Sequence, residues 1–387
     1  MPPRPGRWNS RMPLRRREKN SKVKAKKLPL LLFIGGFLGA GKTTAINSLT
    51  KMLTRRGGKV AVIINDHAPG LVDALFLSDC GAAVHEMAGS RFCCNFGGFA
   101  ETINSAIESC DPDFIMAEPV GSCVDIVATV VRPTMALMSD RVAVAAFSVL
   151  VDPWRWRELA GNSGDESMKY IFDRQLEEAD CIVVTKADSL SGSELQIVLE
   201  QISSRYPSPM ILPVCAPENA GFDEWMNFVR ATPPQERWLH QIDYGRYADS
   251  EAEISWLNAR VSVAPFDPVD GVEAVRELLG MLIAQVRNAG APIGHLKILA
   301  DCEKGFVKAS ATQAGGRFDM DVGFVGPVEK LEFTINIRAA IDPPELSKIV
   351  QAAMNSGFPP EKARSSILYL NTFRPAAPRP TYRFDQS

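Results

Sequence analysis

The sequence predicts a doubly wound α/β domain on a mainly parallel sheet, followed by a smaller α+β domain. Between residues 30 and about 230, short apolar runs alternate with helix-like stretches. Most of these runs are almost continuously apolar, which is typical of strands covered on both faces of a parallel sheet. The length of 387 residues also favours two domains over one. The predicted strands are 30–35, 60–65, 83–87, 114–118, 142–151, 181–185 and 211–215.

A weak internal repeat predicts the second domain. Residues 254–283 and 331–354 each have the pattern of a strand, a turn and a helix. Asp270 and Asp342 stand at the expected helix starts, each with a glutamate three residues later, which is the spacing of a reciprocal cap. With further apolar strands between and after the repeats, this pattern favours a ferredoxin-like sandwich.

Changes in composition give the domain boundaries. The proline-containing stretch near residues 231–250 interrupts the α/β pattern and favours a linker. The expected organisation is a basic disordered arm over 1–28, the α/β domain over 29–235, a linker over 236–250, the α+β domain over 251–372 and a loose tail over 373–387.

The charge of the chain is unevenly distributed, because the N-terminal arm is strongly basic and the remainder is acidic. Residues 1–27 hold eleven Arg or Lys and one Glu, so this segment carries +10 and the remainder of the chain −12. Too few apolar residues are present for the arm to fold alone. We favour a solvated tail, or an extension upstream of a start at Met12, over contact with nucleic acid. Nucleic acid is therefore disfavoured as a partner.

The arm and the apolar run over 28–40 together imitate a secretory signal. Cleavage after that run would remove the phosphate-binding loop described next, so export contradicts the chemistry. No apolar run is long enough to span a bilayer. We expect a reducing cytoplasm and no membrane partner, with an organelle transit peptide as the alternative.

The segment "GFLGAGKT" over 36–43 fits the phosphate-binding pattern G-x-x-x-x-G-K-[ST] between a strand and a helix. Backbone amides at the helix start can cradle phosphates. Lys42 is expected to contact the β and γ phosphates, and Thr43 to ligate Mg²⁺.

Two later segments address the base. "TKAD" over 185–188 resembles the guanine motif N-K-x-D, with Thr185 in place of Asn. Asp188 can accept hydrogen bonds from the N1–H and amino group of guanine, while adenine offers the opposite pattern, so GTP is favoured over ATP. Residues 215–216 stand where GTPases carry Ser-Ala.

Two acidic residues follow strands and are expected at the Mg²⁺ shell. Glu118 ends an apolar strand, and Gly121 follows at the spacing of a D-x-x-G switch. The Gly121 amide can sense the γ-phosphate. Asp66 ends another strand, with a helix cap as its alternative role. Lys42, Asp66 and Glu118 are thus the expected catalytic residues, and Thr43, Asp66 and Glu118 the Mg²⁺ ligands. The expected nucleotide-binding residues are Gly36, Gly39, Ala40, Gly41, Lys42, Thr43, Thr44, Gly121, Thr185, Lys186, Asp188, Cys215 and Ala216.

The order of these segments resembles the CobW family of metal-chaperone GTPases, relatives of the maturation GTPases UreG and HypB. The resemblance covers residues 30 to about 230 strongly and continues more weakly into the second domain, which is similar to the CobW C-terminal domain. The resemblance implies a GTPase whose slow hydrolysis drives delivery of a metal ion or metal cofactor to a client protein.

The family also places a Cys-x-Cys-Cys metal motif between its switch segments. Residues 91–94 read Arg-Phe-Cys-Cys, so Arg91 replaces the first cysteine. Zn²⁺ prefers four ligands, and Cys93 and Cys94 supply two. Cys123 is therefore expected to join them. Zn²⁺ is the expected ion, with Co²⁺ or Ni²⁺ as alternatives.

The cysteine pair also has a competing interpretation. His85 or Glu86 can complete a metal site, but Cys93 and Cys94 can equally be structural remnants of a degenerated one. Arg91 would then contact phosphate or a client.

Two other features are expected to be structural. "DPWRWRELA" over 152–160 is predicted as an exposed helix face, and the isolated His295 as a satisfied structural residue.

Two rival functions remain. The first is a GTP-gated guard of a corrinoid- or metal-dependent partner enzyme that carries no metal itself, and Arg91 is its best support. The second is a phosphotransferase acting on a small acceptor, which "TKAD" disfavours. A homodimer stays open.

Overall fold

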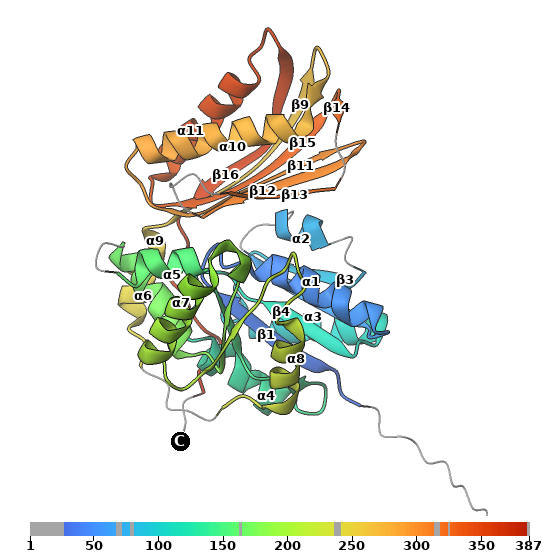
Figure 1. Cartoon of the computed structure of the whole chain (residues 1–387), viewed down its shortest axis with the longest axis vertical. Helices are drawn as coiled ribbons and strands as arrows, with labels where there is room; N and C mark the ends of the chain where they lie inside the picture. Colours follow the sequence, from blue (N-terminus) through green and yellow to red (C-terminus); the bar gives the residue numbers. More distant parts are fainter. Residues whose placement is uncertain are drawn as a thin grey trace, which may run out of the picture.

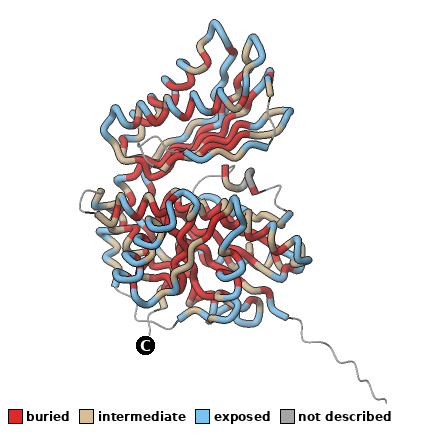
Figure 2. The backbone as a smooth tube through the Cα atoms, in the orientation of Figure 1, coloured by how far each residue is buried: buried red, intermediate tan, exposed pale blue. Residues whose placement is uncertain are grey.

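The computed structural model describes residues 27–66, 72–77, 81–161, 165–235, 241–312, 318–323 and 326–384. Two sheets stand one above the other (Figure 1). In both of them the central strands are buried (Figure 2). The arm over 1–26 lies outside the described residues, as do residues 236–240 of the predicted linker.

The first sheet is parallel, with strand order β3-β2-β4-β1-β6-β7-β8 and β5 beside β1. Helices flank it (Figure 1), which confirms the predicted doubly wound α/β fold. The single strand predicted over 142–151 is instead two strands, because the buried residues 145–147 between them leave the ladder. The strands are β1 (Leu30–Gly36), β2 (Val60–Asp66), β3 (Ala83–Ala88), β4 (Phe114–Glu118), β5 (Ala143–Val144), β6 (Ser148–Val151), β7 (Cys181–Val184) and β8 (Met210–Pro213).

The helices of this part of the chain alternate with its strands, as the βα pattern predicts. They are α1 (Lys42–Arg55), α2 (Val72–Leu77), α3 (Phe96–Cys110), the π-helical turn η1 (Val127–Val131), α4 (Arg132–Leu137), α5 (Pro153–Leu159), α6 (Glu166–Glu177), the short 3₁₀ turn η2 (Ala187–Ser189), α7 (Gly192–Arg205) and α8 (Phe222–Ala231).

The second sheet is antiparallel in the order β13-β12-β11-β15-β9-β16. Strands β9, β11, β15 and β16, with helices α10 and α11 on one face, have the connectivity of the predicted ferredoxin-like fold, and β12 and β13 extend one edge. The strands are β9 (Ser255–Pro265), β10 (Val269–Asp270), β11 (Ile293–Cys302), β12 (Gly305–Ala311), β13 (Phe318–Val322), β14 (Pro327–Val328), β15 (Leu331–Ala339) and β16 (Ala363–Phe373), and the helices are α10 (Gly271–Asn288) and α11 (Pro343–Gly357).

The two predicted caps differ in the structure. Asp270 accepts hydrogen bonds from the backbone N–H groups of Val272 and Glu273. The side chain of Asp342 caps no backbone group and instead pairs with Arg374, because prolines without an N–H occupy the first two positions of α11.

The segment predicted as a linker contains a helix. Helix α9 (Tyr244–Ala252) packs its Tyr247 into the core of the α/β domain, where this side chain is 1% exposed. The second sheet therefore follows a packed helix, where the sequence predicts a linker.

The predicted loose tail also differs. Up to residue 384 the chain runs back along the α/β domain, where Tyr382 packs edge-on against Phe96 at 5.4 Å. The Arg383 side chain donates to Asp125 at 2.8 Å, and Phe384 N donates to Ala128 O at 2.9 Å. These contacts join the end of the described chain to the start of α3 and to the region of η1.

Within the described ranges, no helix combines the length and the apolar character that a membrane crossing requires.

Candidate nucleotide-binding site

The phosphate loop follows β1 and leads into α1. Gly36, Gly39 and Gly41 have φ values of 135°, 78° and 81°, a region that favours glycine. At Gly36 a Cβ would lie 2.5 Å from the carbonyl oxygen of Leu150. The glycines therefore allow the chain to turn tightly and to expose the first N–H groups of α1, where an anion can bind.

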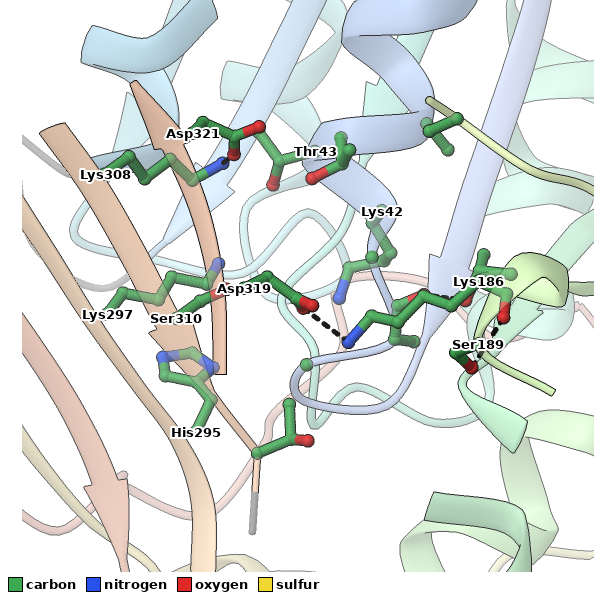
Figure 3. A pocket seen from close by; sticks show the side chains of 18 of the residues that line it. Lys42, Thr43, Lys186, Ser189, His295, Lys297, Lys308, Ser310, Asp319 and Asp321 are labelled. Carbon is green, nitrogen blue, oxygen red and sulfur yellow. Dashed lines mark hydrogen bonds and ion pairs between the residues drawn. The ribbon is translucent and has the colours of Figure 1, made fainter. Parts of the chain in front are cut away.

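A cavity of about 420 Å³ opens at this loop (Figure 3). This volume is within the range of small-molecule sites. The cavity gathers most of the residues expected from the sequence, although their roles remain predictions. The predicted residues that line it are Gly39, Ala40, Gly41, Lys42, Thr43, Thr44, Glu118, Thr185, Lys186, Asp188 and Ala216.

Three expected nucleotide-binding residues stand behind this lining. Gly36 is covered by β6, and Cys215 is buried and exchanges backbone hydrogen bonds with Ala220. Gly121 lies against the Lys42 ammonium, because a Cβ there would be 3.1 Å from Lys42 Nζ.

Lys42 lies in the phosphate loop. Its Nζ donates to the Gly36 carbonyl oxygen at 2.9 Å and lies 3.8 Å from Glu118 Oε1. Burial lowers the pKa of Lys42, and the nearby Glu118 carboxylate opposes that shift. The ammonium is thus held beside the loop amides.

Oxygen ligands gather at the start of α1. The Thr43 hydroxyl donates to Glu118 Oε2 at 3.2 Å. Asp73 on α2 lines the same cavity as Thr43. Burial is the main cause that raises the pKa of Glu118. A hydroxyl and two carboxylates are the donor set that Mg²⁺ prefers, so these residues fit the ion.

Asp73 was not expected from the sequence. Burial alone would raise its pKa, but Lys297 and Lys308 hold the pKa at about 2. Both lysines belong to the second sheet. No local motif marks Asp73, because its neighbours here are far away in the sequence.

Asp66 differs from its predicted role. It does not line the cavity, and its carboxylate contacts Arg338 Nη2 at 3.4 Å. Arg338 projects from β15 and stacks on Trp256, with its Cζ 4.1 Å from the ring centre. The end of β2 therefore meets the second sheet instead of the cavity.

The base motif is tied to the phosphate loop. The Thr185 hydroxyl donates to the Ala40 carbonyl oxygen at 2.9 Å, which gives a local reason for Thr in the Asn position. Lys186, at φ 50°, forms ion pairs with Asp152 at 2.9 Å and Asp319 at 2.8 Å. Asp188 lines the same end of the cavity.

The helix predicted as an exposed face is largely buried. Arg155 and Trp156 of α5 are 1% and 2% exposed. The guanidinium of Arg155 donates to Gly294 O at 2.7 Å and also to Thr312 O, so α5 anchors the second sheet. This contact could not be read from the helical pattern alone.

The cysteine loop, residues 91–94, lies outside the cavity lining. Cys93 is 3% exposed in the apolar core, and its Sγ is 3.6 Å from Cys94 Sγ. The hydrogen bond from Cys93 is the main cause that lowers the pKa of Cys94 to about 5. A weaker contribution comes from the Arg379 backbone N–H, and burial opposes the shift. The pKa of Cys93 is raised by the hydrogen bonds of its thiol with Cys123 and Cys94, together with burial.

The three predicted thiols are neighbours but do not form a complete metal site. Within the described part of the chain, no group of three or more His, Cys, Asp or Glu is arranged to hold a metal ion. The tail crosses this region, where Thr381 N donates to Cys93 O at 2.8 Å and Arg379 N to Cys94 Sγ at 3.3 Å.

Arg91 is buried and faces Glu251 of α9. Its guanidinium pairs with the Glu251 carboxylate and donates to Ala376 O at 3.1 Å. The other oxygen of Glu251 accepts from the Ser122 hydroxyl at 2.5 Å. Ser122 follows Gly121 directly. Glu251 therefore joins the cysteine loop to the predicted switch.

Comparison with known proteins finds similarity over much of the α/β domain. Residues 30–211 match a family model described as CobW/HypB/UreG, nucleotide-binding domain. A zinc chaperone CobW of a Sinorhizobium species is 32% identical over 44% of this chain and 54% of its own length. A zinc chaperone YeiR of Escherichia coli is 30% identical over 40% of this chain and 45% of its own. This chain thus spans about half the length of these relatives.

Other similarities extend further along the chain. A probable GTPase of Mycobacterium bovis is 28% identical over 66% of this chain and 74% of its own. Among solved structures, a Zn(II)-bound YjiA GTPase triple mutant aligns with 85% of this chain and 99% of its own at 17% identity and a TM-score of 0.36. A nickel complex of HypB from Helicobacter pylori aligns with 53% of this chain and 87% of its own at 18% identity and a TM-score of 0.38.

Proposed function

We propose that this chain, whose residues 30–211 match the CobW/HypB/UreG nucleotide-binding family model, is a Mg²⁺-dependent GTPase that delivers a metal ion or metal cofactor to a client protein. The nucleotide-binding family is the premise. The GTP cycle, the cargo and the client are the proposal.

The cavity supports the nucleotide part of this proposal. Lys42 and the amides of the phosphate loop would hold the β and γ phosphates, and Asp188 would select guanine. Thr43 and Glu118 would hold Mg²⁺, with Asp73 beside them. When bound, the ion would neutralise charge on the phosphates. The buried Glu118 would also orient a water molecule toward the γ-phosphate.

The Glu251 bridge is the observation that carries the chaperone part. One of its oxygens holds Arg91 in the cysteine loop, and the other holds Ser122 beside the switch glycine. A change at Gly121 on γ-phosphate loss would move Ser122, and the shared carboxylate would transmit that movement to the cysteines. The cysteine loop would therefore respond to hydrolysis.

The cargo part rests on the Cys94 thiolate and on the names of the relatives. Thiolates favour Zn²⁺, and the two relatives with the highest identities reported above are named zinc chaperones. The alternative is the guard of a partner enzyme. Arg91 favours it, because this residue stands in place of the first cysteine of the motif and its positive charge would repel an incoming metal ion.

Metal titration separates the two functions. The full chain, loaded with Mg²⁺ and a non-hydrolysable GTP analogue, is titrated with Zn²⁺ against a chromophoric chelator. For delivery, Cys93→Ser and Cys94→Ser should each weaken Zn²⁺ binding at least tenfold. Cys110→Ser, at the end of α3, is the control and should leave the affinity unchanged. Equal affinities in all variants would contradict metal delivery and leave the guard.

A further inference from the structure

The second sheet has one apolar face and one polar face. Successive side chains of a strand point to opposite faces. Leu296 and Ile298 of β11 belong to the core with α10 and α11, whereas His295 and Lys297, which alternate with them, line the nucleotide cavity. The polar face continues onto the neighbouring strands. The other cavity-lining residues of this part of the chain are Lys308, Ser310, Ala311, Thr312, Phe318, Asp319, Met320 and Asp321.

This polar face lies against the phosphate loop, and its His295 and Lys308 are buried. A Cβ at Gly39 would lie 2.0 Å from Thr312 Cγ2, so the tip of the loop touches the end of β12. Arg155 fixes the same edge through Ile293 O at 3.0 Å and Gly294 O at 2.7 Å. Polar groups are costly to bury without partners, so a buried polar face calls for a polar ligand or interface.

Two lysines of this face point toward the phosphate end of the cavity (Figure 3). Lys297 Nζ lies 2.6 Å from Asp73, the carboxylate beside Thr43. Lys308 is 3% exposed and lies 3.8 Å from Asp321. With Lys42 across the cavity, the chain surrounds the predicted γ-phosphate position with three ammonium groups.

His295 supplies a second, independent observation. It is 7% exposed in the wall of the cavity, and its Nε2 has no hydrogen-bond partner among the residues that the structure describes. An unpaired buried imidazole nitrogen is costly unless a ligand satisfies it. The neighbouring cations favour an anionic ligand at this place.

We propose that Lys297, Lys308 and His295 bind the phosphates of the nucleotide, so that the second sheet completes the GTP site. This inference rests on the GTP binding proposed above. Lysine is a common ligand of phosphate. The γ-phosphate would compete with Asp73 for Lys297, and the released Asp73 carboxylate would be free to turn toward Thr43 and Mg²⁺. GTP would thereby hold the second sheet against the α/β domain more firmly than GDP.

Nucleotide affinities of single variants test this inference. Calorimetry with the full chain and Mg²⁺ compares GTP and GDP for Lys297→Gln, Lys308→Gln and the control Lys330→Gln. Lys330 belongs to the same domain, and its side chain is 57% exposed. We expect the first two variants to lose GTP affinity about tenfold or more, because a charged hydrogen bond is lost. GDP affinity should fall less, and Lys330→Gln should match the wild type.

A measurement on the wild-type chain guards against misfolding of the variants. Acetylation of lysines is followed by mass spectrometry without nucleotide, with GDP and with a GTP analogue. Lys297 should be protected most by the analogue, whereas Lys330 should not change. Unchanged GTP affinity in both variants, or unchanged Lys297 reactivity, would overturn the inference. A wild-type chain that binds no GTP would instead refute the proposed function.

Discussion

The nucleotide cavity and the cysteine loop lie in the same α/β domain, yet different kinds of neighbour surround them. The cavity's α/β side comes from residues at or after the ends of β1, β2, β4, β7 and β8, which meet at one edge of the sheet. The cysteine loop is enclosed by α9 and by the tail, which come from beyond residue 240. Short motifs therefore describe one region well, and long-range contacts define the other.

The difference also concerns charge. Cations of both domains face the cavity, whereas the cysteine loop uses its own cation, Arg91, in a buried pair with Glu251. A cavity with several ammonium groups suits a polyanion. A loop with one thiolate and one guanidinium neutralised by Glu251 suits a small, soft metal ion. The same loop can instead serve only to change conformation.

Removal of Glu251 is the strongest way to break the link between the two regions. Glu251→Ala leaves Arg91 buried without its carboxylate, which should cost about 3–5 kcal/mol of unfolding free energy. Urea unfolding measures this loss. Glu253→Ala, on the exposed side just after α9, is the matched control and should be almost neutral. A loss below about 1 kcal/mol would contradict the buried ion pair.

Lys42→Ala breaks the cavity alone. Loss of a positioned cation at the phosphates should lower the rate of GTP hydrolysis about 10²–10³-fold. Phosphate release measures the rate. Lys51→Ala, exposed on the same helix, should hydrolyse GTP normally. Equal rates in the two variants would remove Lys42 from the mechanism.

Asp188→Asn sharpens the comparison at the base end of the cavity. The carboxylate of Asp188 offers two acceptor oxygens to the N1–H and amino group of guanine. The amide of Asn offers only one, and its NH₂ group would face the second donor. We therefore expect about a 10- to 100-fold loss in GTP affinity. ATP affinity should change little, which provides an internal reference in the same titration. If the ratio of the two affinities stays constant, Asp188 does not read the base.

The pH dependence of Cys94 probes the cysteine region without a substitution. Because its pKa is lowered to about 5, Cys94 is a thiolate at neutral pH. Its alkylation rate should stay level above that pH and fall about tenfold per unit below it, since only the thiolate reacts. Mass spectrometry of iodoacetamide-treated protein follows the rate, with glutathione as reference. A midpoint near that of an ordinary thiol, about 8.5, would contradict the hydrogen bond from Cys93.

The same contrast explains which sequence predictions were confirmed. The alternating pattern gave the correct doubly wound fold, and the repeat gave the second sheet with its helices. Lys42, Glu118 and Asp188 line one cavity, because each directly follows or lies close to the end of a parallel strand, and their roles stay predictions. Asp66 also ends a strand, but its carboxylate faces Arg338 of β15, a partner that no local motif indicates.

The sequence by itself determined the α/β architecture, the phosphate loop and the base motif, since periodicity and glycine spacing act over a few residues. Only the tertiary structure decided that Asp73, His295, Lys297 and Lys308 share the cavity with Lys42, and that Arg91 faces Glu251. These contacts join residues from about 160 to more than 220 positions apart. Burial and charge pairing select such partners only when both domains are folded, so neither segment reveals them alone.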